Sequence, residues 1–210
     1  MVGPFDEISL SGRHKLFELL GTHIYKYNKN EEILYTLKSK NIIGIVTEGS
    51  AQIIYSEYNG NEIILENLQK DSIFGSNISA ISNDNCQIIA KEPTEILVID
   101  YNTLLNPNNL KYAYFNTFLR NIFEITNSKF RENNERMRIL EKKQLRDKLL
   151  EYFDIQYRKT RSRNINLPFN LKDLADYLAV NRSAMFRELK NLKEDRLIEV
   201  KGKRIILLYR

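Results

Sequence analysis

The sequence predicts an α+β fold in three parts: an N-terminal β-barrel or jelly roll, a long dimerisation helix and a C-terminal winged helix-turn-helix. Three observations support this prediction. Short β-rich runs separated by turn residues fill the first half of the chain, a long stretch without proline or glycine follows, and the last third combines two short amphipathic segments with a basic hairpin. We expect the three parts to span residues 1–108, 109–141 and 142–210 of the 210-residue chain.

The N-terminal part is expected to be a barrel or jelly roll because its β-rich runs are short and closely spaced. Short helices are expected before it, around Phe5–Leu20. Asn59-Gly60-Asn61 predicts a hairpin, since Asn and Gly both accept positive φ angles, and Glu48-Gly49-Ser50 predicts a second tight turn. The clearest strand candidates are Ile33–Leu37, Ile42–Val46, Ala51–Tyr55, Glu62–Leu65 and Glu95–Ile99.

The middle part is predicted to be one long helix, because no proline or glycine occurs from Leu110 to Arg163. Apolar residues recur there at spacings of three and four and form a stripe that resembles a coiled-coil seam. A second copy of the chain would cover this stripe in a twofold homodimer. Alternatively, the helix packs as an ordinary amphipathic helix on its own barrel. The stripe comprises Phe115, Leu119, Ile122, Thr126, Phe130, Met137 and Leu140.

Residues 170–208 carry the clearest functional pattern. Asn170 is placed to cap a first helix, and Asn181 follows a tight turn and is placed to cap a second one. Two short helices joined in this way are typical of proteins that place the second helix in the major groove of DNA. The second helix would turn Met185, Leu189 and Leu192 inward and leave Arg182, Ser183, Phe186, Arg187 and Lys190 on its other faces.

This second helix and the hairpin after it supply the candidate DNA contacts. The planar fork of an arginine can donate two hydrogen bonds to guanine O6 and N7. The runs Leu197–Val200 and Arg204–Leu208 predict a β-hairpin wing whose basic tip, Lys201-Gly202-Lys203, suits the phosphate backbone. A protein-interaction module that merely happens to be basic is the alternative. The candidate DNA-binding residues are Asn181, Arg182, Ser183, Arg187, Lys190 and Lys203.

Charge is distributed unevenly along the chain. Residues 1–141 contain 14 Lys or Arg and 18 Asp or Glu, a net charge of −4, whereas residues 142–210 contain 18 and 9, a net charge of +9. A basic surface attracts nucleic-acid phosphates at long range and gains affinity from released counterions. On the alternative interpretation, these lysines and arginines only solvate the surface.

Composition and motifs exclude several function classes. The single cysteine, Cys86, cannot form an internal disulfide, a CxxC zinc site or a four-thiolate iron–sulfur cluster, so we expect no metal and no cofactor. None of the motifs GxGxxG, GxxxxGK, HExxH and GxSxG occurs, so we do not expect an enzyme. No apolar run is long enough to span a membrane and the first residues do not look like a secretory signal, so we expect a cytoplasmic protein.

From about Ile24 to Leu208 the chain resembles the cyclic-AMP receptor protein and fumarate–nitrate regulator family of bacterial transcription regulators. Glu48-Gly49-Ser50 is similar to the family's strand-turn glycine, and Asp71–Gly75 looks like its Gly-Asp-x-Phe-Gly segment without the first glycine. Val180–Arg187 falls on the recognition-helix motif of the family. The resemblance implies a cyclic-nucleotide-binding-like sensor domain and a homodimer that binds a palindromic double-stranded operator, with RNA polymerase as a further partner.

The same resemblance implies that Arg182, Ser183 and Arg187 contact bases. The family usually has a glutamate where Ser183 stands, and glutamate accepts a hydrogen bond from cytosine N4. Serine is far less selective than glutamate. The resemblance therefore does not predict which operator sequence is bound, nor whether transcription rises or falls.

The resemblance also implies an effector pocket, in which two groups of the family are missing. Members that bind cyclic AMP have a glutamate after the Phe-Gly pair and, further on, an arginine for the cyclic phosphate; these positions are Ser76 and Cys86 here. A buried phosphate without its arginine lacks a bidentate partner. We therefore expect no useful affinity for cyclic AMP, and either another effector or a constitutive DNA-binding form. The candidate pocket residues are Gly75, Ser76, Asn77, Cys86 and Gln87, with Thr126 and Asn127 of the long helix as a lid.

Cys86, His14 and His23 are the remaining candidate sensing groups. Cys86 is open to two interpretations, a thiol sensor or haem ligand on one side and a small buried hydrophobic residue on the other. His14 and His23 lack metal-ligand spacing, so packing or surface roles are expected. The alternative function for the whole chain is a small-molecule or redox sensing module that acts through protein partners.

Overall fold

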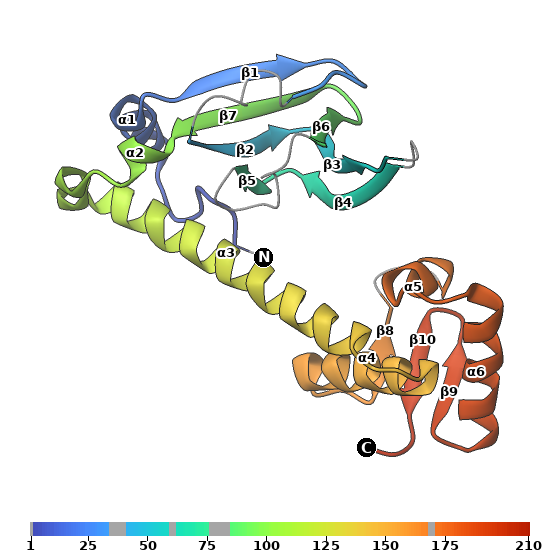
Figure 1. Cartoon of the computed structure of the whole chain (residues 1–210). Coiled ribbons are helices and arrows are strands. Elements are labelled where there is room, and N and C mark those ends of the chain that lie inside the picture. Colours follow the sequence, from blue (N-terminus) through green and yellow to red (C-terminus); the bar gives the residue numbers. More distant parts are fainter. Residues whose placement is uncertain (1, 34–40, 59–61, 76–84, 168–170) are drawn as a thin grey trace. The chain divides into compact units, whose positions relative to one another are not determined.

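The computed structural model describes residues 2–33, 41–58, 62–75, 85–167 and 171–210. The chain forms two compact units, Met1–Asn127 and Ser128–Arg210 (Figure 1). The boundary falls within the long helix α3, which spans Ala113–Leu140. Among the residues that the structure describes, no helix is both long and apolar enough to cross a membrane.

The first unit contains two antiparallel sheets of the jelly-roll type. One has the strand order β1-β7-β2-β5, and the other has the order β4-β3-β6. The jelly roll is confirmed, but a closed barrel is not formed, because no strand pairing joins the two sheets within the described ranges. The strands are β1 (His23–Tyr27), β2 (Ile42–Glu48), β3 (Ser50–Ser56), β4 (Glu62–Gln69), β5 (Ile73–Gly75), β6 (Cys86–Ala90) and β7 (Thr94–Asp100).

Four of the five strand candidates lie within β2, β3, β4 and β7. The fifth, Ile33–Leu37, lies mostly outside the described residues, although the Ile33 N–H donates to the Ile88 carbonyl at 2.7 Å. The turn between β2 and β3 is confirmed: Gly49 has a φ of +78°, and a Cβ there would overlap the Pro93 carbonyl. Strands β3 and β4 pair antiparallel from Ser50 to Ser56, but the hairpin turn at residues 59–61 lies outside the described residues.

The space between the two sheets is filled by apolar side chains. The Phe74 ring lies over Gly44 so closely that a Cβ at this glycine would overlap it. The buried residues of this core lie on strands of both sheets or in the segments next to them. The core comprises Tyr27, Ile33, Ile42, Val46, Ala51, Ile53, Leu68, Phe74, Ile88, Ala90 and Ile96.

Helix α1 (Leu10–Leu20) and the first half of α3 pack together with the four-stranded sheet in a second apolar core. From α3 this core includes Phe115, Phe118, Ile122 and Ile125. Phe115 and Ile122 were predicted to lie in an intersubunit stripe, and they belong instead to the core of their own chain. The first half of the predicted stripe therefore lies on the face that packs on the jelly roll, whereas Phe130, Met137 and Leu140 of its second half are exposed. Two short helices, α2 (Tyr101–Leu104) and the 3-10 helix η2 (Pro107–Lys111), precede α3.

The second unit is a winged helix-turn-helix, as predicted. Its three-stranded antiparallel sheet has the order β8-β10-β9. The buried core takes residues from every helix and strand of the unit, among them Phe153, Leu174, Met185 and Ile205. The elements are α4 (Leu145–Thr160), β8 (Asn164–Asn166), α5 (Leu171–Tyr177), α6 (Arg182–Glu194), β9 (Ile198–Lys201) and β10 (Arg204–Leu207).

Candidate nucleic-acid interface

The turn between α5 and α6 is fixed by local backbone contacts. Ala179 adopts a left-handed conformation with a φ of +51°, and the Val180 N–H donates to the Ala175 carbonyl at 3.0 Å. Asn181 then caps α6, because its side-chain oxygen accepts a hydrogen bond from the Ala184 N–H at 3.2 Å. The predicted cap at Asn181 is therefore present, whereas the predicted cap at Asn170 lies outside the described residues.

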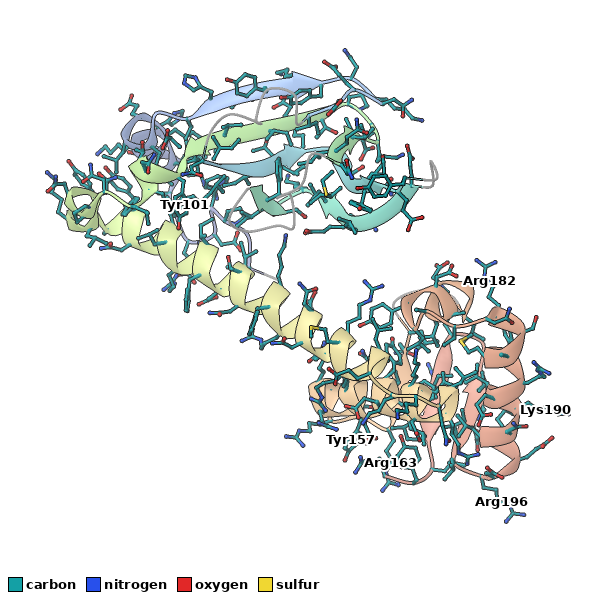
Figure 2. All side chains as sticks on the ribbon, viewed as in Figure 1. Tyr101, Tyr157, Arg163, Arg182, Lys190 and Arg196 are labelled. Carbon is teal, nitrogen blue, oxygen red and sulfur yellow. The ribbon has the colours of Figure 1, made fainter. Side chains whose placement is uncertain are left out.

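Helix α6 has one buried and one exposed side. Met185, Leu189 and Leu192 are buried in the core of the second unit. The opposite side carries the exposed side chains of Arg182, Ser183, Phe186, Arg187 and Lys190. Figure 2 shows Arg182 and Lys190 on the side of α6 that faces away from β9 and β10. The structure therefore brings the predicted base-contacting residues together on one solvent-facing surface.

Arg182 has an intramolecular partner that the sequence did not indicate. Its guanidinium Nη2 lies 3.1 Å from Oδ2 and 3.4 Å from Oδ1 of Asp176 on α5. Both side chains are exposed, so the pair is worth at most about 1 kcal/mol and DNA can compete for the arginine. The pairing depends on the angle between the two helices, which the spacing of the two residues in the sequence does not reveal.

The wing presents a second basic surface. Strands β9 and β10 pair with Lys201 opposite Arg204, and Gly202 between them has a φ of +62°, which suits glycine. The Lys203 carbonyl accepts a hydrogen bond from the Leu167 N–H at 2.9 Å, so the tip of the wing is tied to the backbone beyond β8. The Lys203 side chain is exposed and available to a phosphate.

The candidate pocket residues in the first unit are placed less uniformly. Gly75 ends β5 opposite Ile43, and Cys86 begins β6 with 2% of its surface exposed. Cys86 and Gln87 are neighbours on one strand and therefore face opposite sides of the sheet. Ser76 and Asn77 lie outside the described residues.

The two lid candidates lie on α3. The Thr126 hydroxyl donates to the Ile122 carbonyl of the same helix at 2.8 Å, and Asn127 is half-buried. Throughout the described ranges, the buried polar or charged residues are Thr94, Asn109 and Asn121, and none of these carries a charge. The described part of the jelly roll thus offers no buried cation for a phosphate group. Within the same ranges, no group of three His, Cys, Asp or Glu side chains could hold a metal ion.

Fold and exposed basic surface together define a class of protein, a DNA-binding regulator that joins a jelly-roll domain to a winged helix-turn-helix. Two family models match the chain: a Crp-like helix-turn-helix domain over residues 143–210 and a cyclic nucleotide-binding domain over residues 24–106. The chain belongs to the cyclic-AMP receptor protein and fumarate–nitrate regulator family of bacterial transcription regulators.

Solved structures with this fold include three that match nearly the whole chain. A variant of CprK in complex with OCPA has a TM-score of 0.63 and 16% identity, covering 92% of this chain and 88% of its own. A CooA mutant from Carboxydothermus hydrogenoformans has a TM-score of 0.57 and 20% identity, with coverages of 90% and 85%. The catabolite activator protein of Thermus thermophilus has a TM-score of 0.52 and 15% identity, with coverages of 97% and 92%. No curated protein matches the sequence.

Proposed function

We propose that this protein is a homodimeric, cytoplasmic transcription regulator that reads a palindromic operator through Arg182, Ser183 and Arg187. Asn181 and Lys190 of the same helix surface and Lys203 of the wing add further contacts, and RNA polymerase is a further partner. The observation that carries this proposal is the division of α6 into a fully buried apolar side and an exposed cationic side. Only the cationic side is free to enter a major groove.

We assign the three functional parts to residues 1–108, 109–141 and 142–210. The middle part is the dimerisation helix in this proposal, because α3 retains a second apolar face beyond the one that packs on the jelly roll. Phe123, Phe130 and Met137 are 68%, 65% and 57% exposed and recur at intervals of seven residues. Thr126, Asn133 and Leu140 occupy the alternating positions of the same heptad and are exposed, whereas Leu119, one heptad earlier, packs against the core of the first unit.

A second copy of α3 is the natural cover for this heptad stripe. Burying apolar surface gains about 25 cal/mol for each Å² removed from water, so covering the exposed side chains of this stripe favours association. In a twofold dimer the two α6 helices would need to lie about 34 Å apart to enter successive major grooves. An effector, where one acts, would have to favour the state with this spacing.

For the sensor domain, we propose that cyclic AMP is not the effector. The thiol of Cys86 stands where the family resemblance implies the phosphate-binding arginine, and Cys86 is 2% exposed, on the same buried face of β6 as Ile88 and Ala90. Transferring a phosphate charge into such surroundings without a cation is strongly unfavourable. The protein therefore either responds to another molecule or binds DNA constitutively.

The experiment is a fluorescence-anisotropy titration of the purified protein on duplexes enriched from a randomised pool, at two salt concentrations. We expect one palindrome to bind more tightly than a random duplex, and its affinity to fall steeply with salt as counterions are released. Cyclic AMP is expected to change neither the affinity nor its salt dependence. Binding that requires cyclic AMP would contradict the effector proposal. Salt-insensitive binding, or no enriched sequence, would contradict the DNA proposal and favour a module that acts through protein partners.

A further inference from the structure

Phe186 is a large apolar side chain on the cationic surface of α6. It is 49% exposed, whereas the aromatic residues Tyr152 and Phe153 in the same unit are buried. Helix α6 already turns Met185, Leu189 and Leu192 into the core, so Phe186 is not needed to attach the helix. An aromatic ring at this position needs another explanation.

The position of Phe186 relates it directly to the candidate base contacts. Residues four apart form one row along a helix, so Arg182, Phe186 and Lys190 lie in one row. Ser183 and Arg187 form the adjacent row. The ring therefore lies among the side chains that the proposed function places in the major groove, and Figure 2 shows the two labelled members of its row, Arg182 and Lys190, on the outer side of α6.

The major groove presents one apolar group to such a ring. Guanine, cytosine and adenine display hydrogen-bond donors and acceptors there, whereas thymine also displays its C5-methyl group. A phenylalanine ring cannot bond to a phosphate or to a base edge, but it can cover this methyl group and remove it from water. The cationic neighbours favour a nucleic acid over an apolar protein surface as the partner of this face, because burying Arg182 and Lys190 against apolar atoms would cost free energy.

We propose that Phe186 is a specificity-determining residue that recognises the methyl group of one thymine in each operator half-site. This inference rests on the proposed function of α6 and adds a base to those that Arg182 and Arg187 read. It also means that the selectivity lost with a serine at position 183 is regained through an apolar contact one helical turn further on.

The experiment removes the methyl group without changing base pairing. The full-length protein is first used to enrich a duplex from a randomised pool, and each thymine of that duplex is then replaced by deoxyuridine. At one thymine of each half-site, we expect the affinity of the wild-type protein to fall about fourfold, which is the effect of withdrawing one methyl group from a buried contact. In F186A the same replacement is expected to change the affinity less than about 1.5-fold, since the partner of the methyl group is already gone.

Two variants control this measurement. F186L keeps an apolar side chain and is expected to retain part of the sensitivity to deoxyuridine. L208A removes a similarly exposed apolar side chain from the end of the wing and is expected to show the full wild-type sensitivity. Thermal unfolding of each variant checks the fold, which substitutions at these exposed positions should leave intact.

The outcomes separate this inference from the proposed function. An enriched duplex whose thymines are all insensitive to deoxyuridine, or whose sensitivity persists in F186A, would overturn the role of Phe186 alone. Failure to enrich any duplex would overturn sequence-specific reading by α6 and this inference with it. A thymine whose sensitivity disappears in F186A and persists in L208A supports the inference.

Discussion

Arg182 and Arg187 lie on the same exposed side of α6, and Lys203 lies on the wing. The two groups are expected to differ in what they recognise. A guanidinium fork at the start of a recognition helix can pair with one base edge, whereas a lysine at a hairpin tip meets phosphates, which are the same in every sequence. Selectivity and overall affinity should therefore depend on different residues.

Replacing Arg182 or Arg187 by alanine is expected to weaken binding to the enriched duplex by about 1–3 kcal/mol and to weaken binding to random DNA less. Lys203→Ala is expected to weaken binding to both duplexes equally. It should also lower the magnitude of the slope of log affinity against log salt concentration by about one. Anisotropy titrations on the two duplexes measure the difference, with the exposed Arg120→Ala in the first unit as a basic control. Equal losses on both duplexes in R182A would contradict the assignment of Arg182 to base reading.

Asp176 is expected to restrain Arg182. Removing its charge in D176N would free the guanidinium and remove a negative group from a surface that faces phosphates, so binding to random DNA should strengthen about two- to fivefold. The preference for the enriched duplex should narrow, because the arginine loses the partner that orients it. The same titrations test this expectation, and a weaker affinity for random DNA in D176N would show that Asp176 supports binding in another way.

At the scale of elements, the end of the chain is fastened to α4. The Tyr209 hydroxyl donates to Asp154 at 3.0 Å, and Arg210 forms an ion pair with the same carboxylate. Burial, and then the charge of Asp154, raises the pKa of the Tyr209 phenol, and burial likewise raises the pKa of Tyr152. These tyrosines remain protonated in the folded protein at a pH at which they ionise in the unfolded chain.

This difference predicts a loss of stability at alkaline pH. Because the folded pKa of each phenol is raised, its contribution is fully present below the unfolded pKa of about 10 and is lost as the pH rises beyond it. The loss is at most about 1.4 kcal/mol per pH unit for Tyr152 and smaller for Tyr209, which solvent screens more. Urea unfolding at pH 8 and at several values above pH 10 measures the slope, that is, how steeply the free energy of unfolding falls with pH. We expect Tyr209→Phe to reduce the slope and Tyr58→Phe, at a fully exposed position, to leave it unchanged. An unchanged slope in Y209F would contradict this account.

The elements differ in how far the sequence predicts them. The wing and the strands β2, β3, β4 and β7 were found because alternation and turn residues are local signals. The cap at Asn181 and the inner face of α6 were found for the same reason. The direction in which α3 packs was not predicted from the sequence, because apolar residues at spacings of three and four identify an apolar face but not the surface that covers it. The Arg182–Asp176 pair depends on tertiary geometry and left no pattern in the sequence.

At the scale of the whole molecule, α3 carries two apolar faces with different expected partners. Phe115, Phe118 and Ile125 are covered by the jelly roll of the same chain. Phe123, Phe130 and Met137 remain exposed along the heptad stripe. The two interpretations of the sequence, a dimer seam and a helix packed on its own domain, therefore apply to different faces of one helix. Only the second of these contacts is present within the single chain, and the first remains a prediction.

A charged group on the heptad stripe is expected to separate the protomers. Phe130→Glu or Met137→Glu would place two carboxylates against each other at the centre of the seam, where burying an unpaired charge costs several kcal/mol. Sedimentation velocity should then report the mass of one chain of 24.8 kDa in place of a dimer. Arg131→Glu, at an exposed position beside the stripe, introduces the same carboxylate with a larger change of net charge, so it is a stringent control and should leave the mass unchanged.

The same variants connect assembly with DNA binding. A monomer loses the gain in effective concentration that joins two half-sites, so its affinity for a palindrome should fall about a hundredfold or more and approach its affinity for a single half-site. Its affinity for a single half-site should equal that of the wild-type protein, because α6 and the wing are untouched. A variant that remains dimeric, or a monomer that binds the palindrome as tightly as the wild type, would contradict the assignment of this stripe to the dimer.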